Sequence, residues 1–217
     1  IGDVAQPTTI TSSTISQNTV SPEEIGTTSF FGDGGGILAL SCDGDNQINL
    51  TNDTIAGNTA PGLGGGYYGT GDCPVEGANQ PAAKAHATPA STQPAATNFV
   101  FDTIDANSSG GGGGGNVNTD DPSILNAAQT IISGGVSGGT VGTNCSFADG
   151  GTVTSGGYNL IDDSTCGTAA STDIIGQNPQ LGALANNGGP TNTELPASTS
   201  PAVGAVPATT CTGTGVT

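Results

Sequence analysis

The residues of this chain that could do chemistry are almost all carboxylates. Its 217 residues include 18 Asp and Glu, one Lys or Arg and one His, which gives a formal net charge of −17. Close acidic pairs occur at Asp43 and Asp45, Asp102 and Asp105, Asp120 and Asp121, and Asp162 and Asp163. Two carboxylates about 6.5–9.5 Å apart, with water between them, are all that an inverting glycosidase needs. Such an enzyme therefore stays open as an interpretation.

Other reactions lack the necessary residues. A lyase acting on acidic polysaccharide needs a cation and a tuned base, but Lys84 and His86 both lie in a segment rich in Pro and Ala. We find no nucleophile elbow or Ser, His and Asp triad. Acidic pairs of this kind are also typical of solvated turns. We therefore predict that the protein is not an enzyme and has no catalytic residues.

Calcium is the one cofactor that the sequence suggests, because Asp, Asn and carbonyl oxygens are its usual ligands. The candidate ligands are Asp43, Asp45 and Asn46. Their spacing does not match an EF-hand, and an ordinary surface turn is the alternative interpretation.

The charge balance excludes several classes of partner. Binding to nucleic acid depends on Lys and Arg that neutralise phosphates, and this chain has almost none. No run of about 20 apolar residues is present to span a bilayer. The chain begins at Ile1 and contains no Met, which we interpret as a processed N-terminus and a secreted protein.

Five cysteines lie far apart, without the close spacing of a zinc site. Disulfides in an oxidising compartment fit this pattern. We expect Cys145 to bridge Cys166 and Cys42 to bridge Cys73. Cys211 is then left unpaired or pairs with another molecule.

A short motif repeats along the chain and predicts its architecture. The copies are Thr14–Asn18, Thr54–Asn58 and Thr103–Asn107, with a weaker one at 130–134. Each follows a stretch of two-residue alternation, the period of a strand with one buried face, so we expect the Ile of each copy to point inward. Glycine runs at 34–36, 64–66 and 110–115 provide corners.

Repeated strands and glycine corners predict a parallel β-helix. In that fold Asn18, Asn58 and Asn107 would lie at one corner of successive coils. They would either form a ladder of side-chain amides or simply tolerate a left-handed turn. The copies are irregularly spaced, so loops must interrupt the coils; the largest predicted excursion is the Pro/Ala-rich segment 74–97.

Two parts of the sequence resemble known families. The segment 52–60 with Gly64–Gly66 resembles the repeats of bacterial right-handed parallel β-helix surface proteins. Residues 144–206 are similar to the choice-of-anchor Q domain, in the order 157–161, 173–176, 178–182, 187–191 and 200–203. They depart from it at Asn192–Glu194 and at Gly204–Ala205, where family members often carry a His and an Asp. The resemblance implies a fold and a location at the cell surface, but no reaction.

We therefore expect one all-β domain over 1–217, a right-handed parallel β-helix with irregular loops. The function that fits best is a secreted structural or adhesive surface protein that self-associates, with end-to-end assembly into a filament because the first coil has no covering helix. The alternative is a protein that binds or degrades cell-surface polysaccharide. A third interpretation, ice binding, comes from the Thr-rich stretch 8–14.

Overall fold

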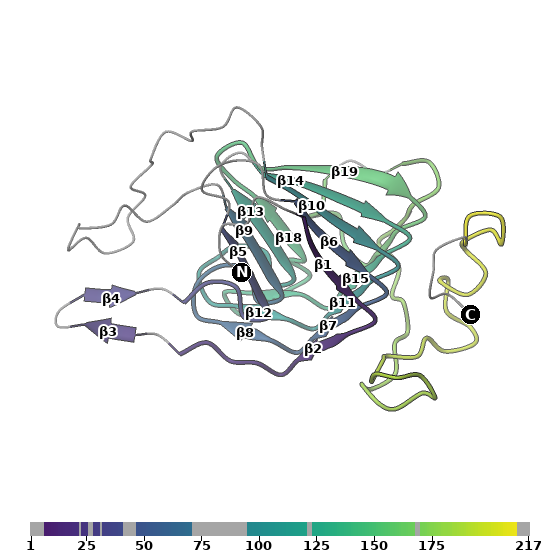
Figure 1. Ribbon diagram of the computed structural model, residues 1–217, viewed down its shortest axis with the longest axis horizontal. Helices are drawn as coiled ribbons and strands as arrows, with labels where there is room; N and C mark the ends of the chain where they lie inside the picture. Colours follow the sequence, from purple (N-terminus) through teal and green to yellow (C-terminus); the bar gives the residue numbers. More distant parts are fainter. Residues whose placement is uncertain are drawn as a thin grey trace.

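The chain forms a parallel β-helix, shown in Figure 1. The computed structural model describes residues 7–21, 23–25, 28–30, 32–40, 47–70, 95–120, 123–167 and 170–211. These described residues are all-β and contain no helix, so none of them forms a helix that could cross a membrane.

Four sheets make up the walls of the helix, and strands stack within each sheet in chain order. Sheet 1 contains β1 (Thr8–Thr11), β6 (Gln47–Thr51), β10 (Ala95–Val100), β14 (Ser123–Ala128) and β19 (Thr152–Gly157). Sheet 2 contains β2 (Thr14–Ser16), β7 (Thr54–Ala56), β11 (Thr103–Asp105), β15 (Ile131–Ser133), β20 (Leu160–Ile161) and β21 (Ile174–Ile175).

The other two sheets are shorter. Sheet 3 contains β8 (Thr59–Ala60), β12 (Ser108–Ser109) and β16 (Val136–Ser137), and the antiparallel β17 (Thr140–Val141) joins its edge. Sheet 4 contains β5 (Ile37–Leu40), β9 (Tyr67–Thr70), β13 (Val117–Asp120) and β18 (Cys145–Phe147). An antiparallel pair, β3 (Glu23–Ile25) with β4 (Thr28–Phe30), leaves the first coil and projects to the left in Figure 1.

The core is a stack of inward aliphatic and aromatic side chains. The predicted Ile column is present: Ile15, Ile55 and Ile104 are in register, the last two are 0% exposed, and Ile15 packs against the core from the first coil. The fourth rung is Ile132, which pairs with Ile104. The weaker motif at 130–134 was therefore aligned one residue early, because Ile131 is only half-buried and Ile132 is 1% exposed.

Glycine runs stack on one another where sheets 3 and 4 meet. The N–H of Gly35 donates to Gly64 O, and the N–H of Gly66 donates to Gly115 O. A Cβ at Gly65 would lie 2.5 Å from the carbonyl oxygen of Gly115 and would collide with the Ser108 backbone. The sequence suggested that these glycines serve bends; at Gly65 the requirement is close approach of neighbouring coils.

Strand β10 begins at Ala95, inside the segment 74–97 that we assigned to an excursion. Thr97 is buried and Ala96 is not, so the alternation of a strand already applies there. Residues 71–94 lie outside the described part of the chain.

After β21 the chain turns back along the outside of sheet 2, at the right of Figure 1. We call residues 177–200 the strap. The hydroxyl of Thr14, in the first coil, donates to the carbonyl oxygen of Asn192 in the strap at 2.6 Å. The strap therefore reaches from the last coils to the first.

Candidate functional site

The three repeat asparagines are hydrogen-bonded in series at the corner between sheets 2 and 3. Asn18 donates from its backbone N–H (3.0 Å) and its Nδ2 (2.9 Å) to Oδ1 of Asn58. Asn58 donates in the same way to Oδ1 of Asn107, at 2.8 and 2.9 Å. The Nδ2 atoms of Asn58 and Asn107 also donate to a carbonyl of the preceding coil, that of Ile15 and Ile55 respectively. These residues therefore form an amide ladder as well as a turn.

The ladder continues beyond the three repeat asparagines through asparagines that lie outside the repeat motif. The next coil has Gly135 where an asparagine is expected, and Asn107 instead donates to Oδ1 of Asn116 at 2.8 Å. Asn116 donates to Asn144 Oδ1 at 2.8 Å, which also accepts the N–H of Gly135. Asn144 ends the ladder on the carboxylate of Asp162 at 2.6 Å. The sequence analysis missed these last members, since they do not follow a Thr-Ile pair; their only signal was their place at the ends of glycine and threonine stretches.

A second ladder runs along the corner between sheets 1 and 2 and uses carboxylates. The N–H of Ser13 donates to Asp53 (2.7 Å), and the N–H of Asp53 donates to Asp102 (2.8 Å). Both acids are 1% exposed. Burial raises the pKa of Asp102 to about 8, the N–H of Asp53 opposes this shift, and the Asp53 carboxylate adds to it. Burial also raises the pKa of Asp53, against the N–H donors of Ser13 and Thr51.

The loop that follows β20 covers the last coil at β18, whereas β19 and β21 each pair on one side only within the described residues. Asn144 N–H donates to Asp163 Oδ2 and Cys145 N–H donates to Thr165 Oγ1, both at 2.9 Å. A disulfide joins Cys145 and Cys166 with 4.8 Å between their Cα atoms, and both cysteines belong to the buried core. The loop thus occupies N–H groups at the edge of β18 and covers apolar side chains there.

The first coil is different. Within the described residues β1 pairs only with β6 and β2 only with β7, so each has one unpaired edge. Asn18 is exposed, and no described donor reaches its Oδ1, which on every later asparagine of the ladder is occupied. Ile10 and Ile15 are partly buried. This end presents both an open ladder and a rim of the core.

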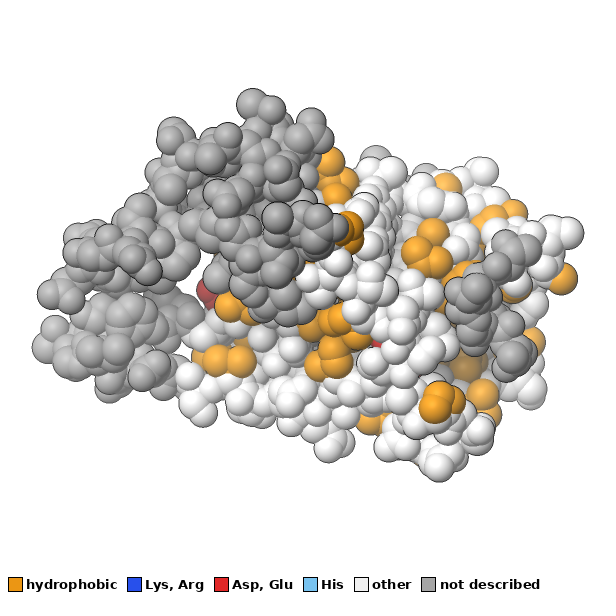
Figure 2. Space-filling view, in the orientation of Figure 1, with side chains coloured by type: hydrophobic (Ala, Val, Ile, Leu, Met, Phe, Trp, Pro, Cys, Tyr) orange, Lys and Arg blue, Asp and Glu red, His pale blue; other side chains and the backbone are white. Residues whose placement is uncertain are grey.

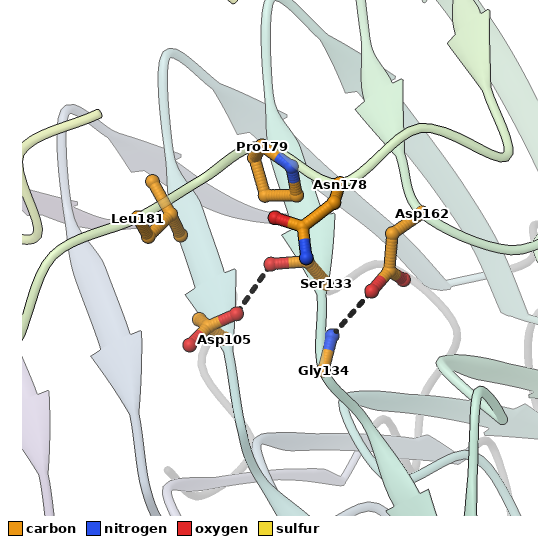
Figure 3. A pocket seen from close by; sticks show the side chains of 7 residues that line it. All are labelled: Asp105, Ser133, Gly134, Asp162, Asn178, Pro179 and Leu181. Atoms are coloured by element: carbon orange, nitrogen blue, oxygen red, sulfur yellow. Dashed lines mark hydrogen bonds between the residues drawn. The ribbon is translucent and has the colours of Figure 1, made fainter. Parts of the chain in front are cut away.

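A small pocket of about 200 Å³ lies between the strap and sheet 2. In Figure 3 the strap residues Asn178, Pro179 and Leu181 pass over Asp105 on β11 and Ser133 on β15. Ser133 donates to Asp105, and Gly134 N–H donates to Asp162 at 3.0 Å. The pocket is therefore polar, with two carboxylates on its solenoid wall.

Burial raises the pKa of Asp105, with the Ser133 hydroxyl opposing and Asp162 adding to the shift. The nearby Glu194 of the strap is half-buried, and its Oε2 atom is buried without a hydrogen-bond partner. Burial and the Asp105 charge together raise the pKa of Glu194 to about 7. The sequence analysis did not single out Glu194 as a functional residue.

The described members of the acidic pairs suggested by the sequence lie in different surroundings. Asp102 belongs to the buried carboxylate ladder between sheets 1 and 2. The side chain of Asp105 lies on the outer side of sheet 2, in the wall of the pocket. Asp162 and Asp163 both accept hydrogen bonds from Asn144. Asp162 accepts from its Nδ2 and Asp163 from its backbone N–H. Asp120 accepts the Tyr68 hydroxyl at 2.9 Å, and its neighbour Asp121 lies outside the described residues.

The other predicted site residues are as follows. The calcium candidates Asp43, Asp45 and Asn46 and the cysteines Cys42 and Cys73 lie outside the described part of the chain. Cys211 is half-buried with a free thiol. Among the residues that the structure describes, no group of three or more His, Cys, Asp or Glu could hold a metal ion.

No protein-family model matches this chain, and no curated protein or solved structure matches it either. The chain is an all-β solenoid of stacked parallel sheets.

Proposed function

We propose that the protein is a secreted structural or adhesive solenoid of the cell surface that associates with further copies of itself through its first coil. The observation that carries this proposal is the open end of the amide ladder at Asn18, next to the unpaired edges of β1 and β2 within the described residues. At the other end the ladder finishes on Asp162, and the loop with Cys166 covers β18.

An open strand edge is a template for another strand, because its N–H and C=O groups lack partners. Here the edge also offers the Oδ1 atom of Asn18, the acceptor that binds the neighbouring coil at every later rung. The partly buried Ile10 and Ile15 add apolar surface. A second copy of the chain is the proposed occupant, since its own strands have the matching alternation and amides.

The loop over β18 limits how copies can join. Direct stacking of a last coil on a first coil would have to displace the loop that holds Asn144 and Cys145. We therefore propose that the first coil receives another first coil or an extended segment. The first arrangement gives a closed dimer and the second allows a filament.

Location outside the cell rests on two supports. The resemblance of residues 144–206 to the choice-of-anchor Q domain points to the surface, and the Cys145–Cys166 disulfide fits an oxidising compartment. The carbohydrate alternative lacks a comparable support, because Tyr67, Tyr68 and Phe99 are buried and no described aromatic is among the exposed large apolar side chains. The outward column of sheet 1 has Thr in its first and last strands and Asn in the three strands between them, unlike the regular Thr array that ice binding needs.

Sedimentation of the full chain over a range of concentrations tests the proposal, with negative-stain images to separate dimers from filaments. Asn18→Ala removes the open acceptor and should weaken association about tenfold, which corresponds to about 1.4 kcal/mol. Thr19→Ala, a change at the neighbouring exposed residue, is the matched control and should have no effect. A protein that stays monomeric at all concentrations refutes the proposal, as does equal association by both variants and the unaltered chain.

A further inference from the structure

Among the described residues one hydrogen bond, from Thr14 to Asn192, joins the strap to the coils, and β21 anchors the chain to sheet 2 just before the strap begins. At its start, β21 extends sheet 2 through Ile174 N–H to Asn159 O (2.8 Å), and Gly176 N–H donates to Ile161 O (2.7 Å). Further along, the strap bonds to itself: Gly182 N–H donates to Leu195 O (2.9 Å), and Ala197 N–H donates to Gln180 O (2.9 Å). The strap is therefore a self-contained unit laid against the outer side of sheet 2.

The surface beneath the strap is uncharged except at one strand. Thr54 and Ala56 flank the inward Ile55, so they point outward, yet they are only 4% and 3% exposed. Thr54 pairs with Thr14, which bonds to the strap. Because of this register, the strap lies over the outer face of β7.

Glu194 is the one ionisable side chain among residues 177–200, and it lies in the seam with sheet 2. Its Oε2 atom is buried without a hydrogen-bond partner. The carboxylate whose charge acts on it is Asp105 of β11, and Asp162 in turn acts on Asp105. The outward side chains of β2, β7 and β15 are Thr, Ser, Ala and Ile, which carry no charge. The only Lys or Arg, Lys84, and the only His, His86, lie outside the described residues, so no described cation compensates these acids.

We propose that the strap is a pH-sensitive cover, docked on sheet 2 while Glu194 is protonated and loosened when Glu194 gives its proton to water. A neutral Glu194 has a hydroxyl that can donate a hydrogen bond to an acceptor in the seam. It carries no charge, so its burial has no cost of removing a charge from water. An ionised Glu194 places a second negative charge opposite Asp105 in a half-buried seam, where the repulsion is stronger than in bulk water. Because few bonds hold the strap between its ends, this repulsion acts on the strap and leaves the coils intact. Loosening exposes the pocket and the outer side of sheet 2.

Hydrogen exchange of the full chain, read by mass spectrometry and corrected for intrinsic rates, tests the proposal at about pH 5.5 and about pH 8.5. Protection of peptides from 177–200 should fall about tenfold between the two, a change equal to one pKa unit of coupling. Peptides from 47–60, in the core, should lose less protection than the strap peptides, because only the general fall in stability with pH acts on them. Unchanged strap protection, or an equal loss in the core peptides, overturns the proposal.

Two variants separate the switch from ordinary packing. Glu194→Gln has the same shape without the charge and should keep the strap protected at both pH values. Asp105→Asn removes the charge that raises the pKa of Glu194 and repels it, so it should reduce the loss of strap protection between the two pH values, whereas Asp149→Asn, on an exposed turn, should leave that loss as it is. If Glu194→Gln loosens as the unaltered chain does, or Asp105→Asn loses as much strap protection as the unaltered chain, the proposal is wrong.

Discussion

At the scale of the residue, asparagine is the side chain on which successive coils depend. Asn107 is 0% exposed, accepts two hydrogen bonds at Oδ1 and donates two from Nδ2. Asp would lack the donor. On the outer face of sheet 1 a further amide ladder joins Asn126 to Asn98 and Asn98 to Asn49. It is less demanding, because Asn98 is half-buried and water can replace its partners.

We therefore predict that Asn107→Ala lowers the free energy of unfolding by about 3 kcal/mol, since it leaves the Asn58 amide and the Ile55 carbonyl without buried partners. Asn98→Ala removes a ladder residue of the same type and should cost less than about 1 kcal/mol. Denaturant unfolding of both variants measures the difference. Equal losses would show that the inner ladder has no special role.

At the scale of the element, the corner between sheets 3 and 4 is set by the distance between backbones. Gly65 has no positive φ, so its backbone conformation is open to other residues. The obstacle is the next coil, whose Ser108 backbone and Gly115 carbonyl oxygen occupy the space of a Cβ.

Gly65→Ala should consequently separate two coils and destabilise the fold by about 3 kcal/mol or more, the range of strongly overpacked sites. Gly189→Ala is the matched control, because its nearest neighbour atom is 3.9 Å from the added Cβ and its φ is not positive. Thermal unfolding of the two variants gives the comparison. A fully stable Gly65→Ala protein would contradict the stacking of these corners.

At the scale of the whole molecule, the buried acids and the negative net charge both make the folded state less stable as the pH rises. Burial raises the pKa of Asp33, Asp53, Asp102 and Asp105 and that of Glu194. On the face shown in Figure 2 the described surface is largely white and orange, with little red. The folded chain therefore hides part of an acidic set that the unfolded chain exposes to water.

Stability should fall as the pH rises. Asp102 titrates near 3.8 when unfolded and at about 8 when folded, so its contribution is complete below 3.8 and is lost as the pH rises to about 8. We predict a melting temperature that decreases from about pH 4 to about pH 8. Asp102→Asn should flatten this dependence, although it also weakens one hydrogen bond; Asp149→Asn should keep it. A melting temperature that rises through this interval contradicts the prediction.

The sequence by itself determined the architecture, because a coil needs only local signals: two-residue alternation, an inward Ile in each repeat, and glycine where the wall turns. It also placed the first three asparagines at one corner and suggested Cys145 and Cys166 as a pair. The register of β15 could not be predicted from the sequence, because Ile131 and Ile132 are equally apolar. Only the pairing with Ile104 selects Ile132 as the inward residue.

Tertiary structure alone decided what lies across coils. Asn116 replaces a missing asparagine because two corners happen to meet, and Glu194 faces Asp105 because a segment distant in sequence returns over sheet 2. Neither relation has a local pattern, as each depends on how far apart the backbones of separate coils lie. The cover of β18 by the loop with Cys166 is likewise a property of the assembled coils, since no local pattern places that loop over the strand.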